Sequence, residues 1–377
     1  MRYTVKIGLI VPGFSASESD WCIPALLDLV RELSRAHRVH VFALRYPHRR
    51  GRYSVYGAQV DACGGALASG LGRLPLLTRA LTAIVAEARR GAFDVLHGFW
   101  ADEPGFLAVS AGRLLNTPSV VSVAGGELVG FADIGYGGQL GLLNRWLTGR
   151  ALRAARQVTV GSRLLASLAK DHGAARPILA PLGVDTLRFF PSRRVRRTTD
   201  ETGPRRLLHV ASLLPVKDQA TLLRALAQVV ATRPDVVLDM AGDGPLRQPL
   251  QRLAQTLGIA AHVRFLGALP HECLPELYQH ADLCLLSSRH ESQNLAILEA
   301  AACGTPVVGT AVGVLPELAP PDCAVPVGDA GAMAAAILRL LEDDERRQRL
   351  GEMQCEIVYQ RFALDRTVEK LTALYAE

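Results

Sequence analysis

Short apolar strands alternate with longer helix-forming segments along this chain, and this alternation restricts the possible folds more than any other feature. In the first half, residues 5–11 and 39–44 have the pattern of buried strands, and residues 23–33 between them have that of a helix. Further strand candidates are residues 94–97, 118–123, 157–160 and 178–180. Alternation of this kind predicts a parallel sheet whose strands are joined by crossover helices.

The same alternation starts again at Leu207 and predicts a second sheet. Its strand candidates are residues 236–240, 262–266, 282–286 and 306–309. Residues 192–206 separate the two halves, and they are polar, charged and bounded by prolines, as an exposed linker would be. A chain of 377 residues is long enough for two such domains.

Composition excludes several classes of protein. Seven cysteines without any Cys-x-x-Cys pair argue against a disulfide framework or a zinc site. The net charge of +6 permits an anionic partner, but the basic segments contain no nucleic-acid recognition motif, so we expect no nucleic acid. No apolar run approaches the roughly 18 residues that span a bilayer, and the chain begins with a strand pattern. We therefore expect a cytoplasmic protein.

The segment from Ser288 to Val308 contains the strongest functional signal, two glutamates separated by seven residues. Glu291 follows the strand candidate at 282–286, and Glu299 lies in a helix-forming stretch that ends before Gly304. Loops at the carboxyl ends of parallel strands bind ligands in open α/β folds. A helix amino end suits a diphosphate, and a carboxylate further along can accept hydrogen bonds from sugar hydroxyls. The spacing favours a sugar nucleotide.

Four further segments occur in a consistent order around this one: LAPLGVDTLRFFP at 179–191, VASLLPVKD at 210–218, AGDGPLR at 241–247, and the FLG, LY and apolar strand sequences within 263–286. Together with the glutamate pair they resemble the retaining glycosyltransferases of family 4, over nearly the whole chain. The resemblance implies an α/β protein of GT-B fold, with two Rossmann-like domains whose parallel sheets face each other across a cleft. The domains implied are an acceptor domain at 1–190, a linker at 191–206, a donor domain at 207–358 and a returning C-terminal helix at 359–377.

The resemblance also implies roles for residues of the donor site. Lys217 and Glu291 are the catalytic candidates: the ammonium would offset charge on the leaving diphosphate, and the carboxylate would face the donor sugar. Glu299 would bind the ribose hydroxyls. The other expected donor-binding residues are Gly13, Ser212, Gly242, Asp243, Gly267, Gln293, Asn294 and Leu295. Solvated surface charges are the alternative for the lysine and the glutamates, and helix capping is the alternative for Asn294.

The first half departs further from the family pattern. Ala124 stands where a donor-contacting histidine is usual, and Ser212 in the second half replaces a usual arginine. The candidates for acceptor binding are His97, Glu127, Asp133 and Tyr136. A structural histidine at a strand end is an equal alternative for His97, and loop ordering is the alternative for Asp133 and Tyr136. Cys303, beside the glutamate helix, is a candidate nucleophile, but a packing role is the favoured interpretation.

These features predict a metal-independent, cofactor-free enzyme that moves a sugar from an NDP-sugar to a glycan, lipid-linked or small-molecule acceptor with retention of configuration. The departures at Ala124 and Ser212 leave open a degenerate GT-B protein that binds without turnover, and an enzyme that epimerises or hydrolyses its sugar nucleotide is a further alternative. Leu143, Trp146 and Leu147 recur near helical spacing beside several arginines, which permits peripheral contact with the membrane. A core-facing helix with a solvated arginine face is the favoured alternative.

Overall fold

The computed structural model describes residues 4–65, 70–192 and 203–376 and divides into two compact units. Unit 1 contains residues 1–183 and 364–377, and unit 2 contains residues 184–363. The expected linker at 191–206 falls largely on residues 193–202, which lie outside the described residues. Residues 184–192 belong to unit 2, whereas the sequence analysis had divided them between the first domain and the linker.

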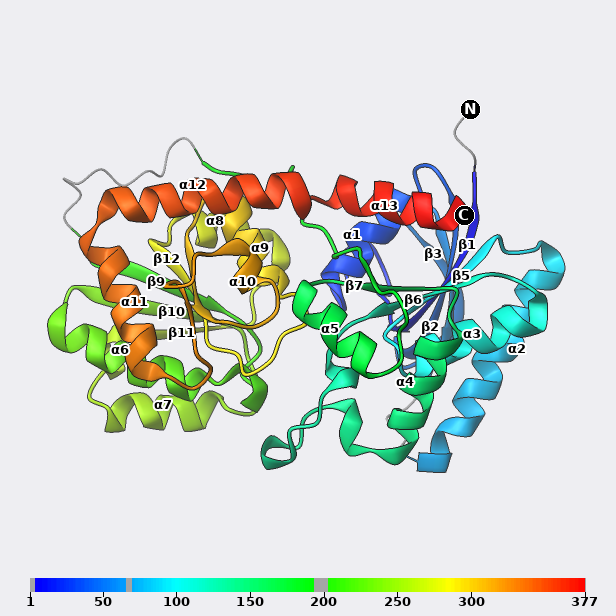
Figure 1. Cartoon of the computed structure of the whole chain (residues 1–377), viewed down its shortest axis with the longest axis horizontal. Coiled ribbons are helices and arrows are strands. Elements are labelled where there is room, and N and C mark those ends of the chain that lie inside the picture. The colour runs from blue at the N-terminus through cyan, green and yellow to red at the C-terminus, as the bar shows by residue number, and fades with distance from the viewer. Residues whose placement is uncertain (1–3, 66–69, 193–202, 377) are drawn as a thin grey trace. The chain divides into compact units, whose positions relative to one another are not determined.

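Unit 1 is built on an eight-stranded sheet with the order β3-β4-β2-β1-β5-β6-β7-β8 (Figure 1). Its strands are β1 (Lys6–Gly13), β2 (Arg38–Tyr46), β3 (Arg50–Val55), β4 (Ala58–Cys63), β5 (Val95–Phe99), β6 (Ser119–Val123), β7 (Gln157–Val160) and β8 (Ile178–Leu179). All neighbours are parallel except β3 and β4, which form an antiparallel hairpin at one edge. The predicted parallel sheet is confirmed, and this hairpin is an addition to it.

Helices cover both faces of the unit 1 sheet. They are α1 (Pro24–Leu33), α2 (Leu74–Arg90), α3 (Glu103–Leu115), α4 (Leu142–Ala154), α5 (Arg163–Asp171) and α13 (Leu364–Ala376). Alternate residues of β1 face opposite cores: Leu9 packs with α1 and α13, and Ile10 packs with α2 and α3. The C-terminal helix α13 contributes Leu371 and Tyr375 to the first of these cores, beside α1 (Figure 1).

Unit 2 has a six-stranded, fully parallel sheet with the order β11-β10-β9-β12-β13-β14. The strands are β9 (Arg205–Val210), β10 (Val236–Ala241), β11 (Val263–Gly267), β12 (Leu283–Leu286), β13 (Val307–Thr310) and β14 (Ala324–Val325). Counted from β9, this is the 3-2-1-4-5-6 order of the dinucleotide-binding fold. The chain reverses its direction of winding between β9 and β12, so the sheet has a topological switch point there.

The helices of unit 2 also form two layers. They are α6 (Gln219–Thr232), α7 (Arg247–Thr256), α8 (Leu274–Gln279), α9 (Leu295–Ala302), α10 (Leu315–Leu318), α11 (Ala330–Glu342) and α12 (Asp344–Arg361). In β9, Leu207 packs with α6, α7 and α11, and the next residue, Leu208, packs with α8, α9, α10 and α12. Consecutive apolar residues are therefore buried on opposite faces, as expected of a parallel strand between two layers.

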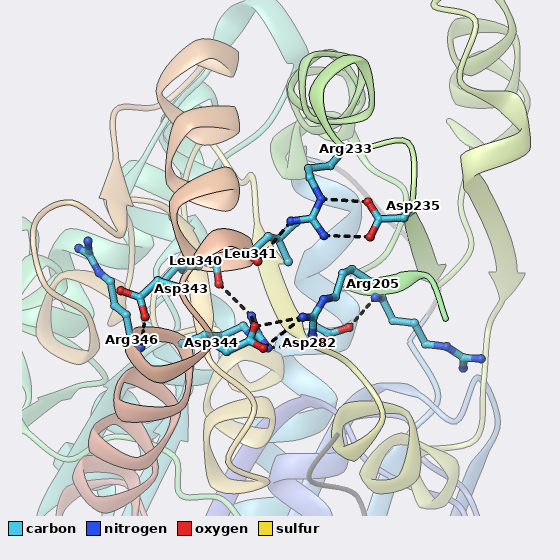
Figure 2. Close-up of polar contacts among 11 residues, drawn as sticks. Arg205, Arg233, Asp235, Asp282, Leu340, Leu341, Asp343, Asp344 and Arg346 are labelled. Atoms are coloured by element: carbon cyan, nitrogen blue, oxygen red, sulfur yellow. Dashed lines mark hydrogen bonds and ion pairs between the residues drawn. The ribbon is translucent and has the colours of Figure 1, made fainter. Parts of the chain in front are cut away.

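Ion pairs fasten the amino edge of this sheet to the junction of α11 and α12. The guanidinium of Arg205 donates to both carboxylate oxygens of Asp344, at 3.1 and 3.2 Å, and to Asp282, at 3.2 Å (Figure 2). Asp282 also accepts a hydrogen bond from the backbone N–H of Arg206 at 2.7 Å. This cluster ties β9, β12 and α12 together at the edge opposite the loops that follow the strands.

Candidate functional site

At the switch point of unit 2, β9 and β12 pair over only a short length. Their register covers Leu207 with Leu283 and Leu208 with Cys284, and the ladder ends there. Beyond it, the buried imidazole of His209 donates from Nδ1 to the carbonyl of Leu285, at 2.9 Å. Burial lowers the pKa of His209 to about 4, so this residue is neutral at physiological pH. The neutral His209 side chain therefore links β9 to β12 just before the loops that follow these strands.

Lys217 and Glu291 meet above this point. Lys217 ends a short turn after β9, and Glu291 lies in the loop after β12. The lysine Nζ is 2.6 Å from Oε1 of Glu291. The same oxygen accepts from Ser288 Oγ at 2.6 Å and from Asn294 Nδ2 at 2.8 Å. One carboxylate oxygen therefore collects three donors, one of them charged, and the two catalytic candidates of the sequence analysis are in direct contact.

Hydrogen bonds between the two loops fix this arrangement. Ser287 donates through Oγ to the carbonyl of Lys217 at 2.7 Å, and the N–H of Arg289 donates to the carbonyl of Val216 at 2.8 Å. Thr310, at the end of β13, donates to the carbonyl of Ser288 at 2.7 Å. The loops after β9, β12 and β13 thus hold one another in place before any ligand arrives.

Asn294 caps the start of α9. Asn294 has a positive φ of 74° and accepts from the N–H of Ile297 at 3.2 Å, so it caps the helix while its amide donates to Glu291. The capping alternative is therefore present in the structure. Leu295 begins the helix, and N–H groups of a first turn have no intrahelical partner. Gln293 is buried, and its carbonyl accepts from Val314 at 3.2 Å.

Glycine at position 313 allows the loop carrying Glu291 to lie close to the start of α10. A Cβ there would be 2.7 Å from the carbonyl oxygen of Gln293 and 2.9 Å from Cβ of Glu291, and the backbone φ is +58°. Any side chain at this position would push against the loop that holds the carboxylate. The sequence analysis did not identify Gly313, although a glycine between β13 and the next helix is a signal that could have found it.

Glu299 lies on α9 and is held from two sides. Its Oε1 is 2.7 Å from Nε2 of His271, and its Oε2 accepts from the hydroxyl of Tyr278 at 3.0 Å. Burial and the adjacent charge of Glu299 raise the pKa of the fully buried Tyr278 hydroxyl. The hydroxyl therefore stays protonated and donates its hydrogen bond to the carboxylate of Glu299. Sequence reasoning missed both partners, although Tyr278 lies within the LY motif.

The other donor candidates of unit 2 gather beside the switch point. The N–H of Gly242 donates to the carbonyl of Gly267 at 2.7 Å, and a Cβ on Gly242 would lie 2.0 Å from the carbonyl oxygen of Ala211. The loops after β9, β10 and β11 therefore touch through their backbones. Ser212 is exposed, and the carboxylate of Asp243 is about half exposed and 3.5 Å from Arg247. Their contact with a donor stays a prediction.

His97 of unit 1 is fully buried in β5. Its Nδ1 is 2.6 Å from the hydroxyl of Tyr375, and its Nε2 is 2.7 Å from Oγ of Ser122. Burial lowers its pKa to about 3. With no exposed surface and both nitrogens engaged, this geometry favours the structural alternative over acceptor contact. The partner Tyr375 belongs to the C-terminal helix, so His97 helps to dock that helix.

Glu127 lies in a short turn after β6, next to the start of α3. Its Oε1 accepts from the N–H groups of Ala124 and Ala101, at 2.8 and 3.0 Å, whereas its buried Oε2 has no hydrogen-bond partner among the described residues. Burial raises the pKa of Glu127. Burial, together with the charges of Glu127 and Glu103, raises the pKa of Asp102 to about 7. Two neighbouring carboxyl groups at the carboxyl edge of the unit 1 sheet therefore do not ionise like free ones.

This perturbed pair makes the stability of unit 1 depend on pH. A carboxyl whose pKa is higher in the folded than in the unfolded chain destabilises the fold when it is ionised. That penalty is complete above pH 7 and is relieved as the pH falls toward the unfolded pKa of about 4. We expect Asp102→Asn to raise the free energy of unfolding about 2 kcal/mol more at pH 8 than at pH 5.5.

Urea unfolding at the two pH values measures this difference. The exposed Asp171, at the end of α5, supplies the control, and Asp171→Asn should change the free energy of unfolding equally at both. An effect of Asp102→Asn that is the same at pH 8 and pH 5.5 would contradict the assignment.

The remaining candidates of unit 1 are placed as follows. Gly13 is the last residue of β1. Asp133 is exposed in a short turn, and Tyr136 is half-buried and pairs with Phe131 through two backbone hydrogen bonds. A Cβ on Gly126 would lie 2.9 Å from the hydroxyl oxygen of Tyr136, so this ring reaches the turn that carries Glu127. Donor contact by Gly13 and acceptor contact by the others stay predictions.

Two further expectations concern reactive groups. Burial raises the pKa of the Cys303 thiol, which argues against a nucleophilic thiolate at neutral pH. All seven cysteines, which fall among the described residues, are unpaired. Within residues 4–65, 70–192 and 203–376, no group of three or more histidine, cysteine or acidic side chains could hold a metal ion.

No helix among the described residues is long and apolar enough to cross a bilayer.

Several characterised proteins are similar to part of this chain. The chain is 35% identical to N-acetyl-alpha-D-glucosaminyl L-malate synthase of Bacillus anthracis over 172 residues, which is 45% of this chain and 44% of that protein. It is 31% identical to MMP alpha-(1->4)-mannosyltransferase of Mycolicibacterium hassiacum over 286 residues, 71% of this chain and 66% of the relative. For the first three curated relatives, the match spans somewhat less than half of the relative's length.

Solved structures match over nearly the full length. Sucrose-phosphate synthase from Thermosynechococcus elongatus aligns with a TM-score of 0.78 and 22% identity, covering 99% of this chain and 98% of that one. Anabaena Alr3699/HepE, solved in complex with UDP and glucose, aligns with a TM-score of 0.76 and 19% identity, covering 99% of each chain. At these identities the likeness establishes the fold, two parallel-sheet α/β domains of the GT-B type.

Family models account for most of the sequence. Residues 25–188 match the model described as Glycosyltransferase Family 4, and residues 193–354 match the one described as Glycosyl transferases group 1. The first match lies mostly in unit 1, and the second lies within the range of unit 2 and includes Lys217 and Glu291. This chain therefore belongs to the family 4 glycosyltransferases and has the GT-B fold.

Proposed function

We propose that this protein is a retaining glycosyltransferase that transfers a sugar from an NDP-sugar to a hydroxyl group of an acceptor. The observation that carries the proposal is the contact of Lys217 with Glu291 at the switch point of unit 2, where open α/β sheets bind their ligands. Glu299 lies on the helix that begins directly after this loop. Lys217 and the amino end of that helix then serve the diphosphate, Glu291 serves the sugar and Glu299 serves the ribose.

In this proposal the bond between the anomeric carbon and the diphosphate oxygen breaks while the acceptor oxygen approaches from the same face. Lys217 offsets the charge that develops on the leaving diphosphate, as a preorganised cation does without reorganising. The leaving phosphate takes the acceptor proton, so no separate protein base is needed. Family 4 enzymes generally work without a metal, and we propose the same here, with Lys217 and the start of α9 facing the diphosphate.

We expect the matching nucleoside diphosphate to raise the melting temperature of the wild type and not that of Glu299→Ala. A ligand at 100 times its dissociation constant stabilises the folded state by about 2.7 kcal/mol. A screen of UDP, GDP and ADP and their sugar conjugates measures the shift as the difference between bound and free protein. This difference cancels the destabilisation that the unpaired Tyr278 hydroxyl causes in the variant.

Glu345→Ala is the control, because that side chain is 85% exposed on α12. It should keep the full ligand-induced shift. An equal shift in Glu299→Ala and the wild type would contradict the donor-site assignment, and the absence of any shift in the wild type would favour the degenerate protein.

The proposal also names the chemical class of the acceptor. Relatives are named for acceptors such as L-malate, D-inositol 3-phosphate and phosphatidylinositol monomannoside, which are small molecules or lipids. We propose an acceptor of one of these two classes, bound by unit 1 at the carboxyl edge of its sheet. The residues that we propose there are Tyr136, whose hydroxyl lies beside Gly126, and Glu127, the residue after that glycine.

Peripheral membrane contact is proposed for α4. Its buried face contains Leu147 and Leu152, whereas Leu142 is 80% exposed and Trp146 is 53% exposed. Arg145, Arg150 and Arg153 are exposed on the same helix. An apolar pair among cations suits an anionic lipid surface.

We expect the wild type to sediment with anionic vesicles at low salt, and the double variant Arg150→Gln, Arg153→Gln to remain in the supernatant. Each basic residue near such a surface contributes about 1 kcal/mol. The control with equal net charge is Arg349→Gln, Arg366→Gln, at two exposed arginines elsewhere. Equal sedimentation of both double variants would contradict the role of α4.

A further inference from the structure

The carboxylate of Glu299 is fixed by two donors that come from different segments of unit 2. His271, in the turn before α8, contacts Oε1 at 2.7 Å, and Tyr278, on α8, donates to Oε2 at 3.0 Å. The side chains of His271 and Glu299 are 9% and 11% exposed, so both still reach the surface. A carboxylate oxygen can accept about two hydrogen bonds. Each oxygen of Glu299 therefore has one accepting position left after these two contacts.

A third residue determines which nitrogen of His271 carries the proton. The guanidinium of Arg188 is 3.1 Å from Nδ1 of His271. A guanidinium can donate hydrogen bonds but cannot accept them. Nδ1 must therefore be the acceptor, and in the neutral ring the proton lies on Nε2, which faces Glu299. Arg188 selects the tautomer that donates to the glutamate.

The surroundings of Arg188 hold it in this position. Its backbone N–H donates to the carbonyl of Asp185 at 3.0 Å, and its guanidinium is 3.9 Å from the Asp185 carboxylate. The next residue, Phe189, is fully buried, and its ring lies 5.2 Å from the imidazole of His271 and 6.0 Å from the ring of Tyr278. Arg188 and Phe189 therefore lie directly against the groups that hold Glu299.

We propose that His271 and Arg188 are positioning residues for recognition of the donor ribose. His271 orients the Glu299 carboxylate so that its two remaining accepting positions match the two vicinal hydroxyls of a ribose, and Arg188 keeps His271 in the donating tautomer. The inference rests on the proposed function, in which Glu299 binds the ribose. It adds that this recognition depends on Arg188, which lies 83 residues before His271 in the sequence.

The test compares a nucleoside diphosphate with its 2′-deoxy form by titration calorimetry. The nucleotide is the one among UDP, GDP and ADP that stabilises the wild type. Loss of a hydrogen bond to a charged group is expected to make the wild type bind the 2′-deoxy form about tenfold or more weakly. His271→Asn should reduce this discrimination to about threefold or less, because the shorter amide does not reach Glu299.

His271→Gln is the matched variant, since its amide nitrogen lies near the position of Nε2 and can donate to Glu299. It should keep discrimination close to that of the wild type. His280→Asn is the control at an exposed histidine at the end of α8. If His271→Asn keeps the full discrimination, or weakens both nucleotides equally, His271 has only a structural role and the proposal is wrong.

Nitrogen-15 spectra of the histidine rings test the role of Arg188 directly. The wild type should show a protonated Nε2 and an unprotonated Nδ1 for His271, and Arg188→Met should shift the population toward the other tautomer. A wild type with the proton on Nδ1 would overturn the proposal.

The donor-site assignment can fail separately from this inference. If the wild type binds both nucleotides equally, the assignment of Glu299 to the ribose fails and the inference fails with it. If the wild type discriminates and Glu299→Ala removes the discrimination while His271→Asn does not, only the inference fails.

Discussion

Replacing Lys217 with alanine is expected to lower kcat/KM for the sugar nucleotide by about 10² to 10³-fold, the cost of losing one preorganised group that stabilises developing charge. The decrease should fall mainly on kcat, because the charge on the diphosphate grows as the sugar leaves. Steady-state kinetics with the donor found in the nucleotide screen measure both constants. Lys170→Ala, at an exposed lysine on α5, is the control and should retain wild-type activity.

The fold should tolerate this change. Ser288 and Asn294 continue to donate to Glu291 when the ammonium is gone, so the loop keeps two of its three contacts. We expect the free energy of unfolding to fall by about 1 to 3 kcal/mol, because the carboxylate left behind is only 9% exposed but keeps two hydrogen-bond donors. Activity within a factor of three of the wild type, or a loss fully explained by unfolding, would contradict the catalytic role of Lys217.

Replacing Asp282 with alanine is expected to destabilise unit 2 by about 3 kcal/mol, the cost of breaking a buried ion pair by removing one partner. The side chain of Asp282 is 5% exposed and accepts from both Arg205 and the backbone of Arg206. Its removal leaves the partly buried N–H of Arg206 and part of the Arg205 guanidinium without their acceptor (Figure 2). Urea unfolding followed by circular dichroism measures the change.

Asp344 provides a matched control in the same cluster, because its side chain is 34% exposed. Asp344→Ala should cost about 1 kcal/mol or less, since solvent screens its pairs with Arg205 and Arg347. All three tryptophans, Trp21, Trp100 and Trp146, belong to unit 1, so their fluorescence reports on that unit separately. Equal destabilisation by the two substitutions would show that burial of Asp282 does not determine its contribution.

The sequence predicted the parallel sheets well because buried strands are apolar on both faces. Leu207 and Leu208 are consecutive apolar residues that pack against opposite helix layers, and such a run is hard to mistake for a solvated segment. The hairpin of β3 and β4 was missed for a physical reason. Its two-residue turn is Tyr56-Gly57, with both residues at positive φ, and the usual Asn-Gly or Asp-Gly signal is absent.

The candidate site was predictable where residues lie close in the sequence and unpredictable where the fold brings them together. Glu291, Asn294 and Glu299 share one loop and helix, so their spacing alone indicated a site. His271 reaches the Glu299 carboxylate from 28 residues away, and Arg188 reaches His271 from 83 residues away, so no local pattern connects the three. The burial of His97 was equally hidden, because its partner Tyr375 is 278 residues away.

The most direct test of the account is to measure release of the nucleoside diphosphate by the wild type and by Lys217→Ala, with and without small-molecule and lipid-linked acceptors. We expect release by the wild type to depend on the acceptor, with one diphosphate released for each sugar transferred. We also expect Lys217→Ala to release it about 10² to 10³-fold more slowly. Release at the same rate without any acceptor would indicate hydrolysis, and a wild type that binds the sugar nucleotide but releases nothing with any acceptor would contradict the proposal that this protein is a glycosyltransferase.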